Sequence, residues 1–247
     1  MMQAFSYRYD LRTAFDDFLT ICICAFSQNP LTGKSHDEDI YLATIAKYKK
    51  EEVPHEFPRL LAMLIVEMEQ RLESGMGNDV LGDFYEMHLY RKGASQYFTP
   101  WPICMFMSQS LVGDEKENEE YRRILDPCCG SGRMLLAGGK SFGNQHYFYG
   151  IDIDLTCVKM TAINLFLNGQ FRSEVMCGDA LSPIDFRVSY LISFLPFGIF
   201  RIEDKEKSEL WHMHHNTFTR KKAEILNLKL PSEEGRQDFK GSQLELF

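Results

Sequence analysis

The fold is decided by the stretch Ile124-Leu125-Asp126-Pro127-Cys128-Cys129-Gly130-Ser131-Gly132. A short apolar run ends in an acidic residue, turns through two glycines and leads into residues 133–137, which have the composition of a helix start. This order predicts a strand, a glycine loop and a helix, an arrangement in which backbone N–H groups approach a ligand closely. The pattern is Asp-x-x-x-Gly-x-Gly, which differs from the Gly-x-Gly-x-x-Gly of dinucleotide-binding folds.

The chain around this stretch alternates between strand-like and helix-like patterns. Strands are predicted over 121–126, 147–152, 173–177 and 189–194, and a helix over 156–167. Strands that alternate with helices are typical of an α/β protein with a parallel sheet covered on both faces. Such sheets bind ligands at the carboxyl ends of their strands, beside the point where the strand order reverses.

Two acidic residues stand at the ends of the next two predicted strands. Asp152 comes twenty residues after Gly132, and Asp179 follows the third strand. In nucleotide-binding α/β folds an acid at the position of Asp152 accepts hydrogen bonds from ribose hydroxyls. The alternative is a surface acid at a strand end.

The motif Asp-Pro-x-x-Gly-Ser-Gly at 126–132 resembles the cofactor loop of S-adenosylmethionine (SAM)-dependent DNA methyltransferases that modify an exocyclic amine. Upstream, Gln96-Tyr97-Phe98-Thr99-Pro100 resembles the segment that closes over the methionine of SAM in these enzymes. The resemblance implies a Rossmann-like methyltransferase sheet, with Ile153 packing on adenine and Asp179 accepting from its amine. The residues it assigns to cofactor binding are Phe98, Thr99, Pro100, Asp126, Pro127, Gly130, Gly132, Asp152, Ile153 and Asp179.

Residues 1–92 are predicted to be helical, since apolar residues recur at helical spacing and Asp10 is a plausible cap. The last helical stretch, 79–86, and the segment after it resemble the modification (M) subunit of type I restriction-modification systems, in which a helical region precedes the methyltransferase core. A helical cap that only covers the sheet is the alternative. We therefore expect a helical part over 1–92, a SAM-binding core over 93–200 and a polar, partly helical tail over 201–247.

The loop after the fourth strand departs from the family pattern. The family carries (Asn/Asp/Ser)-Pro-Pro-(Phe/Tyr) there, and this chain has Phe194-Leu195-Pro196-Phe197. The resemblance implies that Pro196 and Phe197 are catalytic, with Phe197 stacking on a flipped base; a core aromatic is the alternative. Phe194 then occupies the position of the family's Asn, Asp or Ser and cannot accept a hydrogen bond from the target amine. Losing one such hydrogen bond costs about 10²–10³ in rate. Ser193 replaces that group only if the strand slips by one residue.

The net charge of −8 argues against a protein that grips DNA alone. The acidic run 114–120 is predicted to be a solvated connector. We interpret the basic clusters as solvated surface rather than phosphate contacts, so binding to DNA is expected to need a partner such as a specificity subunit. These clusters are 47–50, 91–92, 122–123 and 220–222.

The seven cysteines show no metal-ligand spacing, which is typical of reduced thiols in the cytoplasm. A reactive role for Cys128 and Cys129 in the glycine loop is the less favoured reading. No run of 18 uncharged apolar residues predicts a membrane span. The segment His212-Met213-His214-His215 is interpreted as a polar surface turn rather than a metal site, and no metal is predicted.

No convincing strand is predicted after the fourth, so we expect either a truncated sheet or one that a second chain completes. The last five residues resemble the Gln-Leu-x-Leu-Phe peptide by which bacterial proteins dock onto the DNA polymerase sliding clamp. The resemblance assigns partner binding to a free tail, and the alternative is a tail that folds onto the core. The residues are Gln243, Leu244, Leu246 and Phe247.

Two functional classes remain open. One is a DNA adenine-N6 methyltransferase that acts in a restriction-modification or mobile-element system. The other is a SAM-binding regulator or scaffold without the transfer step, which the replacement at Phe194 favours. Adenine N6 is distinguished from cytosine N4 only by the resemblance, because the two chemistries share these motifs.

Overall fold

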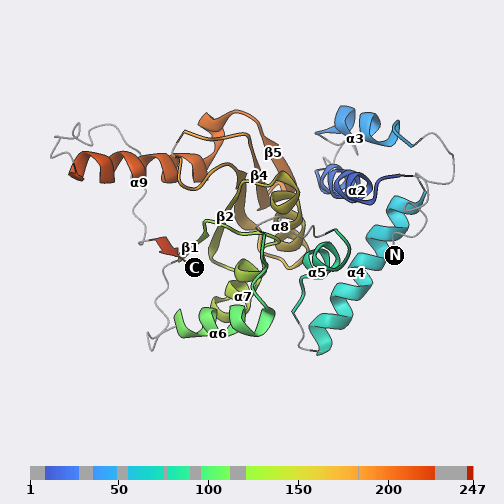
Figure 1. Cartoon of the computed structure of the whole chain (residues 1–247), viewed down its shortest axis with the longest axis horizontal. Helices are drawn as coiled ribbons and strands as arrows, with labels where there is room; N and C mark the ends of the chain where they lie inside the picture. The colour runs from blue at the N-terminus through green and yellow to red at the C-terminus, as the bar shows by residue number, and fades with distance from the viewer. Residues whose placement is uncertain are drawn as a thin grey trace.

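A computed structural model of the chain describes residues 9–27, 36–48, 55–74, 77–89, 96–111, 121–182, 184–225 and 244–246. The helices, in chain order, are α2 (Leu11–Phe26), α3 (Glu38–Ile45), α4 (Glu56–Ser74), α5 (Val80–His88), α6 (Trp101–Leu111), α7 (Arg133–Phe142), α8 (Leu155–Leu167), the 3-10 helix η1 (Lys205–Lys207) and α9 (Glu209–Ile225). The strands are β1 (Arg123–Asp126), β2 (Tyr147–Asp152), β3 (Arg172–Cys177), β4 (Val188–Phe194), β5 (Phe197–Ile202) and β6 (Leu244–Leu246). Figure 1 shows the sheet at the centre with the N-terminal helices beside it.

The described strands form one sheet in the order β5-β4-β3-β2-β1-β6. β1, β2 and β3 run parallel and are connected through α7 and α8, as the alternating pattern predicts. This β1-α7-β2-α8-β3 unit is the Rossmann-like part of the fold. This unit confirms the α/β class. Its three strands and β4 are the four predicted strands, with bounds that shift by no more than two residues.

The direction of β4 corrects the expectation of a wholly parallel sheet. β4 pairs antiparallel with β3, and β5 pairs antiparallel with β4. The described residues of the connection 178–187 form no helix, and a parallel neighbour needs a crossover of a dozen or more residues. A short connection therefore returns the chain in the opposite direction.

The sheet also contains two strands that were not predicted. β5 follows β4 through a tight turn at Leu195 and Pro196. β6 pairs parallel with β1, with Leu244 opposite Arg123 and Leu246 opposite Leu125. The polar tail therefore contributes a strand to the sheet. Gln243 and Phe247 lie outside the described residues.

The two faces of the sheet pack against different helices. Ile124, Phe148 and Val175 point into the larger core with residues of α2, α7 and α8. Their strand neighbours, including Leu125 and Tyr149, point to the other face, where Leu210 and Trp211 of α9 cover them. This alternation is the period of two that a strand imposes on its side chains.

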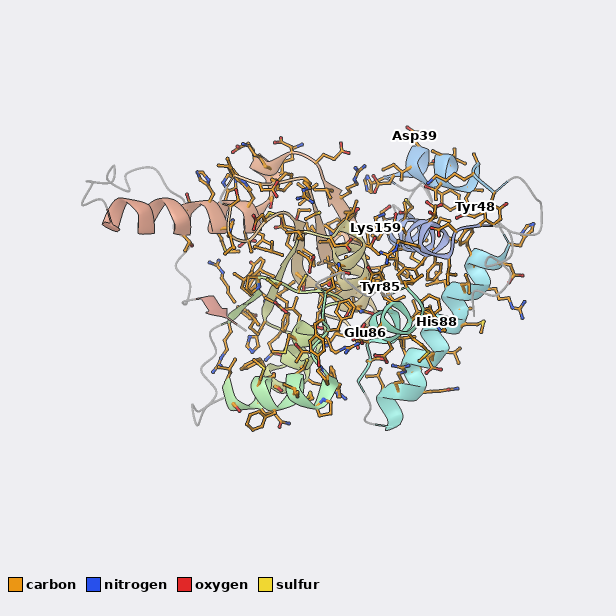
Figure 2. All side chains as sticks on the ribbon, in the orientation of Figure 1. Asp39, Tyr48, Tyr85, Glu86, His88 and Lys159 are labelled. Carbon is orange, nitrogen blue, oxygen red and sulfur yellow. The ribbon has the colours of Figure 1, made fainter. Side chains whose placement is uncertain are left out.

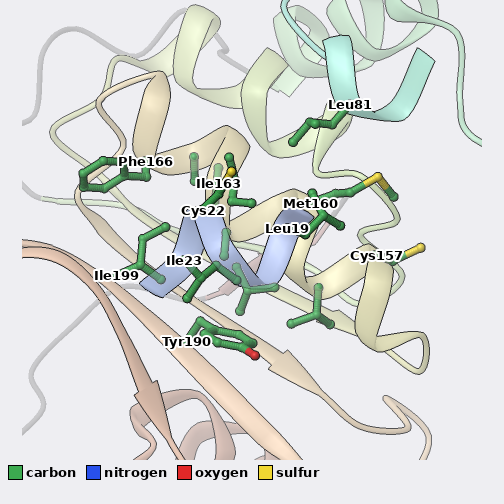
Figure 3. Close-up of a cluster of buried hydrophobic side chains, with 14 of the residues drawn as sticks. Leu19, Cys22, Ile23, Leu81, Cys157, Met160, Ile163, Phe166, Tyr190 and Ile199 are labelled. Carbon is green, nitrogen blue, oxygen red and sulfur yellow. The ribbon is translucent and has the colours of Figure 1, made fainter. Parts of the chain in front are cut away.

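The N-terminal helices share the larger core with the sheet. Figure 3 shows Leu19, Cys22 and Ile23 of α2 beside residues of α8 such as Met160 and Ile163, with side chains from the sheet below them. Lys159 of α8 adds polar links to α2 by donating to Asp16 Oδ2 at 2.8 Å and to Thr20 Oγ1 at 2.9 Å (Figure 2). The α2 helix begins as predicted, because Asp10 accepts a hydrogen bond from Thr13 N at 2.9 Å.

Among the described helices, none is long and apolar enough to cross a membrane. All seven cysteines carry free thiols. The acidic run 114–120 and the basic pair 91–92 lie outside the described residues.

Candidate functional site

The predicted cofactor residues meet at the carboxyl ends of β1, β2 and β3. Asp126 and Asp152 end the neighbouring strands β1 and β2, and Asp179 follows β3, which pairs with β2 on its other side. Parallel strands place these ends along one edge of the sheet. The glycine loop 127–132 connects β1 to α7 at the same edge.

The loop turns on two glycines that adopt left-handed backbone angles. The φ angles are +54° at Gly130 and +86° at Gly132, a region that favours glycine. A Cβ atom at Gly132 would lie 2.8 Å from Thr161 Cγ2 of α8, so the loop sits directly on that helix. Thr161 Oγ1 holds the loop by donating to Gly130 O at 2.9 Å. Gly132, the N-cap of α7, has no side chain to accept from the first N–H groups of the helix, which leaves them suited to an anion.

Asp152 fixes the loop from the neighbouring strand. Its Oδ2 accepts from Gly130 N at 2.9 Å, and its Oδ1 accepts from Asp154 N at 2.8 Å. Burial raises the pKa of Asp152, and the two N–H donors oppose that shift. Each carboxylate oxygen keeps lone pairs for further donors, such as a pair of ribose hydroxyls.

Asp126 is a second buried carboxyl at the same edge, with 6% of its surface exposed. Burial, together with the charge of Asp152, raises its pKa to about 6, although Cys128 N donates to Asp126 Oδ1 at 3.0 Å. Two neighbouring buried carboxyls form an acidic site suited to a cation. Cys128 is exposed, but partial burial of its thiol and the nearby carboxylates raise its pKa. A raised pKa opposes thiolate formation.

The segment ahead of α6 reaches the glycine loop, as the resemblance implies. Phe98 is buried and packs on the loop so closely that a Cβ at Gly130 would lie 2.6 Å from its ring. Thr99 O accepts from Arg133 Nη1 at 3.3 Å, and Pro100 O accepts from Ile103 N at 2.9 Å in the first turn of α6. Pro127, the remaining loop residue assigned to the cofactor, is half-buried.

The remaining two residues assigned to the cofactor, Ile153 and Asp179, are less buried than Asp126. Ile153 follows Asp152 and is 62% exposed, which leaves its side chain available to an aromatic ring. Asp179 is half-buried; its backbone N donates to Asp185 Oδ2 at 2.9 Å and its Oδ1 accepts from Leu181 N at 2.8 Å.

Pro196 and Phe197 lie at the other end of the sheet, which corrects their assignment to the catalytic site. Because β4 runs antiparallel to β3, its last residues face the start of β3, and Ser193 pairs with Arg172. Phe197 packs on Phe166 of α8, with ring centroids 5.0 Å apart. The hairpin is therefore part of an aromatic cluster at the end of the sheet away from the glycine loop, and Phe197, which is 50% exposed, is not a core aromatic either.

Two further sequence interpretations need correction. The histidine-rich segment 212–215 lies within α9 rather than in a turn, and its His214 Nε2 lies 2.8 Å from Ala180 O. Residues Leu244–Leu246 pair with β1 and do not form a free tail.

Sequence reasoning missed a polar group beneath the loop. Its centre is the buried carboxylate of Asp79, which accepts hydrogen bonds from the buried side chains of Ser131, Arg133 and Asn164. The available signal was Arg133 itself, since a cation in the first turn of a helix opposes the helix dipole.

A separate cleft of about 780 Å³ opens between the start of α3 and the segment from β5 to η1. It shares no residue with the site described above and lies beside β5, the outermost strand of the sheet next to β4. Its charged residues are His36, Asp37, Glu38, Asp39, Arg201, Glu203, Asp204 and Lys207.

A glycine loop between a strand and a helix, flanked by acids on the next two strands, defines an α/β protein of the nucleotide-cofactor-binding class. The chain belongs to the N-6 DNA Methylase family, whose model matches residues 76–230, more than half of the sequence.

The chain is also similar to individual proteins. The chain is 28% identical over 159 residues to the type I restriction enzyme MjaVII methylase subunit of Methanocaldococcus jannaschii, a match covering 58% of this chain and 26% of that protein. The chain thus spans about a quarter of that relative's length. Among solved structures, it is similar to the methyltransferase subunit of a type I restriction-modification system from Streptococcus thermophilus, with 16% identity, a TM-score of 0.30, and 64% of this chain and 50% of that chain covered.

Proposed function

We propose that this chain binds SAM at the carboxyl ends of β1, β2 and β3 and serves in methyl transfer to the N6 amine of adenine in DNA. The observation that carries the proposal is Asp152, which ends β2 at the carboxyl edge where ligands bind and accepts from Gly130 N of the glycine loop. Family membership supports the donor and the acceptor class.

The residues at this edge fit the parts of SAM. Asp152 suits the ribose hydroxyls, Ile153 the face of the adenine ring, and Asp179 the adenine amine. The uncapped start of α7 suits the methionine carboxylate. Asp126 adds negative charge beside a ligand that carries a positive sulfonium and a positive ammonium group.

When bound, SAM supplies an electrophilic methyl group. The described residues bind and orient this donor and exclude water from it through the buried ring of Phe98. They supply no asparagine or aspartate in a Pro-Pro motif beside the glycine loop, because the matching hairpin lies at the other end of the sheet. Acceptor contacts are therefore expected from a partner.

The proposed partners are DNA and a further protein subunit, in keeping with the M-subunit resemblance. The proposed location is the cytoplasm, where free thiols such as these stay reduced. Docking on a sliding clamp through residues 243–247 would compete with the pairing of β6 on β1, because the same backbone would have to leave the sheet.

Calorimetric titration with SAM tests the proposal. Wild-type protein should bind SAM, and Asp152→Ala should weaken binding about 10- to 100-fold because hydrogen bonds to a charged group are lost. Asp204→Ala removes an exposed carboxylate elsewhere and should bind like the wild type. Equal affinities in all three proteins would overturn the proposal.

A catalytically impaired SAM-binding module is the second candidate, which the remote aromatic hairpin favours. A methyl-transfer assay on adenine-containing DNA separates the two. Transfer by the chain alone would exclude the second candidate. Binding of SAM without transfer, even when a specificity subunit is added to supply the acceptor contacts, would support it.

A further inference from the structure

Asp79 is a buried carboxylate that collects four hydrogen-bond donors from separate parts of the chain. It caps α5 by accepting from Gly82 N at 2.8 Å, and it accepts from Asn164 Nδ2 of α8, also at 2.8 Å. Ser131 Oγ of the glycine loop and Arg133 Nε, at 2.8 Å, are the other donors. Only 2% of Asp79 is exposed, so these donors replace the water that a carboxylate loses on burial.

Arg133 extends the contacts from Asp79 to the segment ahead of α6. Its Nη1 donates to Thr99 O at 3.3 Å, and its guanidinium carbon lies 5.8 Å from the centre of the Phe98 ring. Its Nη2 donates to Asp83 at 2.9 Å and to Glu86 at 3.0 Å, both on α5. Figure 2 shows Glu86 on the side of α5 that faces α7. The guanidinium thus joins α5, the glycine loop and the Phe98 segment.

Gly82 allows α5 to approach the loop this closely. A glycine within a helix is less favourable than alanine by about 1 kcal/mol. At Gly82, however, an added Cβ would overlap Asp79 Oδ2 and lie 2.5 Å from Ser131 Oγ. Glycine at position 82 therefore lowers the intrinsic stability of α5 but leaves room for the contact between Asp79 and Ser131.

Ser131 is the loop residue that these contacts hold. Its hydroxyl donates to Asp79, and its backbone O accepts from Asn164 Nδ2 at 2.8 Å. It stands between Gly130 and Gly132, two residues with wide backbone freedom, so neighbouring groups are needed to select one loop conformation. Asp152 and Thr161 hold the loop at Gly130, and Asp79 holds it one residue further on.

We propose that Asp79 is a positioning residue for the cofactor loop. Through Ser131 and Arg133 it fixes the loop backbone in the conformation that binds the cofactor, so α5 of the N-terminal helical region is a working part of the site. This inference rests on the proposed SAM site and deepens it, because Asp79 acts through other residues.

Three variants test this role from different directions. Asp79→Asn replaces an acceptor with an amide that faces the donors of Arg133, Ser131→Ala removes only the link to the loop, and Gly82→Ala inserts a methyl group between them. Each should raise the Kd for SAM, by about tenfold for Asp79→Asn and Gly82→Ala and less for Ser131→Ala. Combined changes at positions 79 and 131 should be less than additive, because they break one shared contact.

Hydrogen exchange of the SAM-free protein gives a readout that does not depend on the cofactor. The amides of residues 128–133 should exchange faster in Asp79→Asn and Ser131→Ala than in the wild type, since the loop loses an anchor.

Asp17→Asn is the matched control. Asp17 is also buried, at 4% exposure, and accepts from Lys47 Nζ at 2.6 Å and from Tyr48 OH at 2.8 Å within the N-terminal helices. Its substitution should lower the free energy of unfolding but leave loop exchange and the Kd for SAM unchanged.

The two readouts separate the possible failures. Faster loop exchange in a protein that fails to bind SAM at all would support the positioning role and refute the proposed function. Unchanged loop exchange, or equal loss of SAM affinity in Asp79→Asn and Asp17→Asn, would overturn the positioning role. Ser131→Ala decides the matter if Asp79→Asn does not fold.

Discussion

At the scale of single residues, the site holds two buried carboxyls, Asp126 and Asp152, that are close enough for the charge of Asp152 to raise the pKa of Asp126. Burial raises the pKa of both carboxyls, and the charge of Asp152 adds to the shift at Asp126. A bound cation would offset the repulsion between the carboxylates of Asp126 and Asp152. Groups of this kind commonly reduce stability in favour of function.

The first prediction concerns stability and pH in the absence of ligand. The pKa of Asp126 is raised to about 6 in the folded state, so its contribution is most favourable below pH ~4 and is lost as pH rises through ~6. Asp126→Asn should therefore raise the free energy of unfolding at pH 7.5 by about 3 kcal/mol, given a shift of roughly two pKa units for a side chain that is 6% exposed. Urea unfolding at pH 4.5 and 7.5 measures this gain, and an equal effect at both pH values would contradict the assignment.

The second prediction concerns SAM affinity and pH. Ionised Asp126 attracts a cationic ligand, and its protonated form does not, so the Kd for SAM should fall about tenfold as pH rises from 5 to 7.5. Calorimetric titrations at both pH values measure the change. In Asp126→Asn the dependence should largely disappear; a variant with the full wild-type dependence would show that another group is responsible.

At the scale of elements, the half of the sheet that binds the cofactor could be predicted, and the other half could not. Local signals mark β1, α7, β2, α8 and β3: apolar runs that end in acids, and Asp154, which caps α8 through Thr156 N at 2.9 Å. The direction of β4 depends on the connection 178–187, and the position of the hairpin depends on that direction. A motif at the end of a strand therefore indicates a site only if the strand runs parallel to its neighbours.

The third prediction tests the position of the β4–β5 hairpin. Phe194→Asn restores the family's polar residue, but the side chain lies beside Phe171, with ring centroids 5.7 Å apart, at the far end of the sheet. The variant should leave the Kd for SAM and the methyl-transfer rate unchanged and lower the free energy of unfolding by about 1 kcal/mol through the lost aromatic contact. Methyl transfer that appears or rises in this variant would show that the hairpin reaches the cofactor.

At the scale of the whole molecule, the N-terminal helices and the sheet share one core and one polar centre. Asp79 and Arg133 bond although they are distant in the sequence, and neither local periodicity nor a motif reports such a pairing. Pairing of β6 with β1 is equally non-local, and a tail of polar residues gives no sign of it. Both features follow from packing of the complete chain.

The fourth prediction concerns β6. Removing residues 243–247 deletes the strand that pairs with β1 and exposes the edge of β1. The truncated protein should be less stable by about 1 kcal/mol and should associate at increasing concentration, measured by urea unfolding and analytical ultracentrifugation. A truncated protein with wild-type stability and a wild-type sedimentation profile would show that the pairing contributes nothing in solution.

The central claim is that the carboxyl edge of β1, β2 and β3 binds SAM, and calorimetric titration of the wild type beside Asp152→Ala tests it most directly. We predict binding with a Kd on the order of micromolar for the wild type and a loss of about 10- to 100-fold in the variant, with Asp204→Ala unaffected. No heat of binding in the wild type, or the same Kd in Asp152→Ala, would contradict the claim.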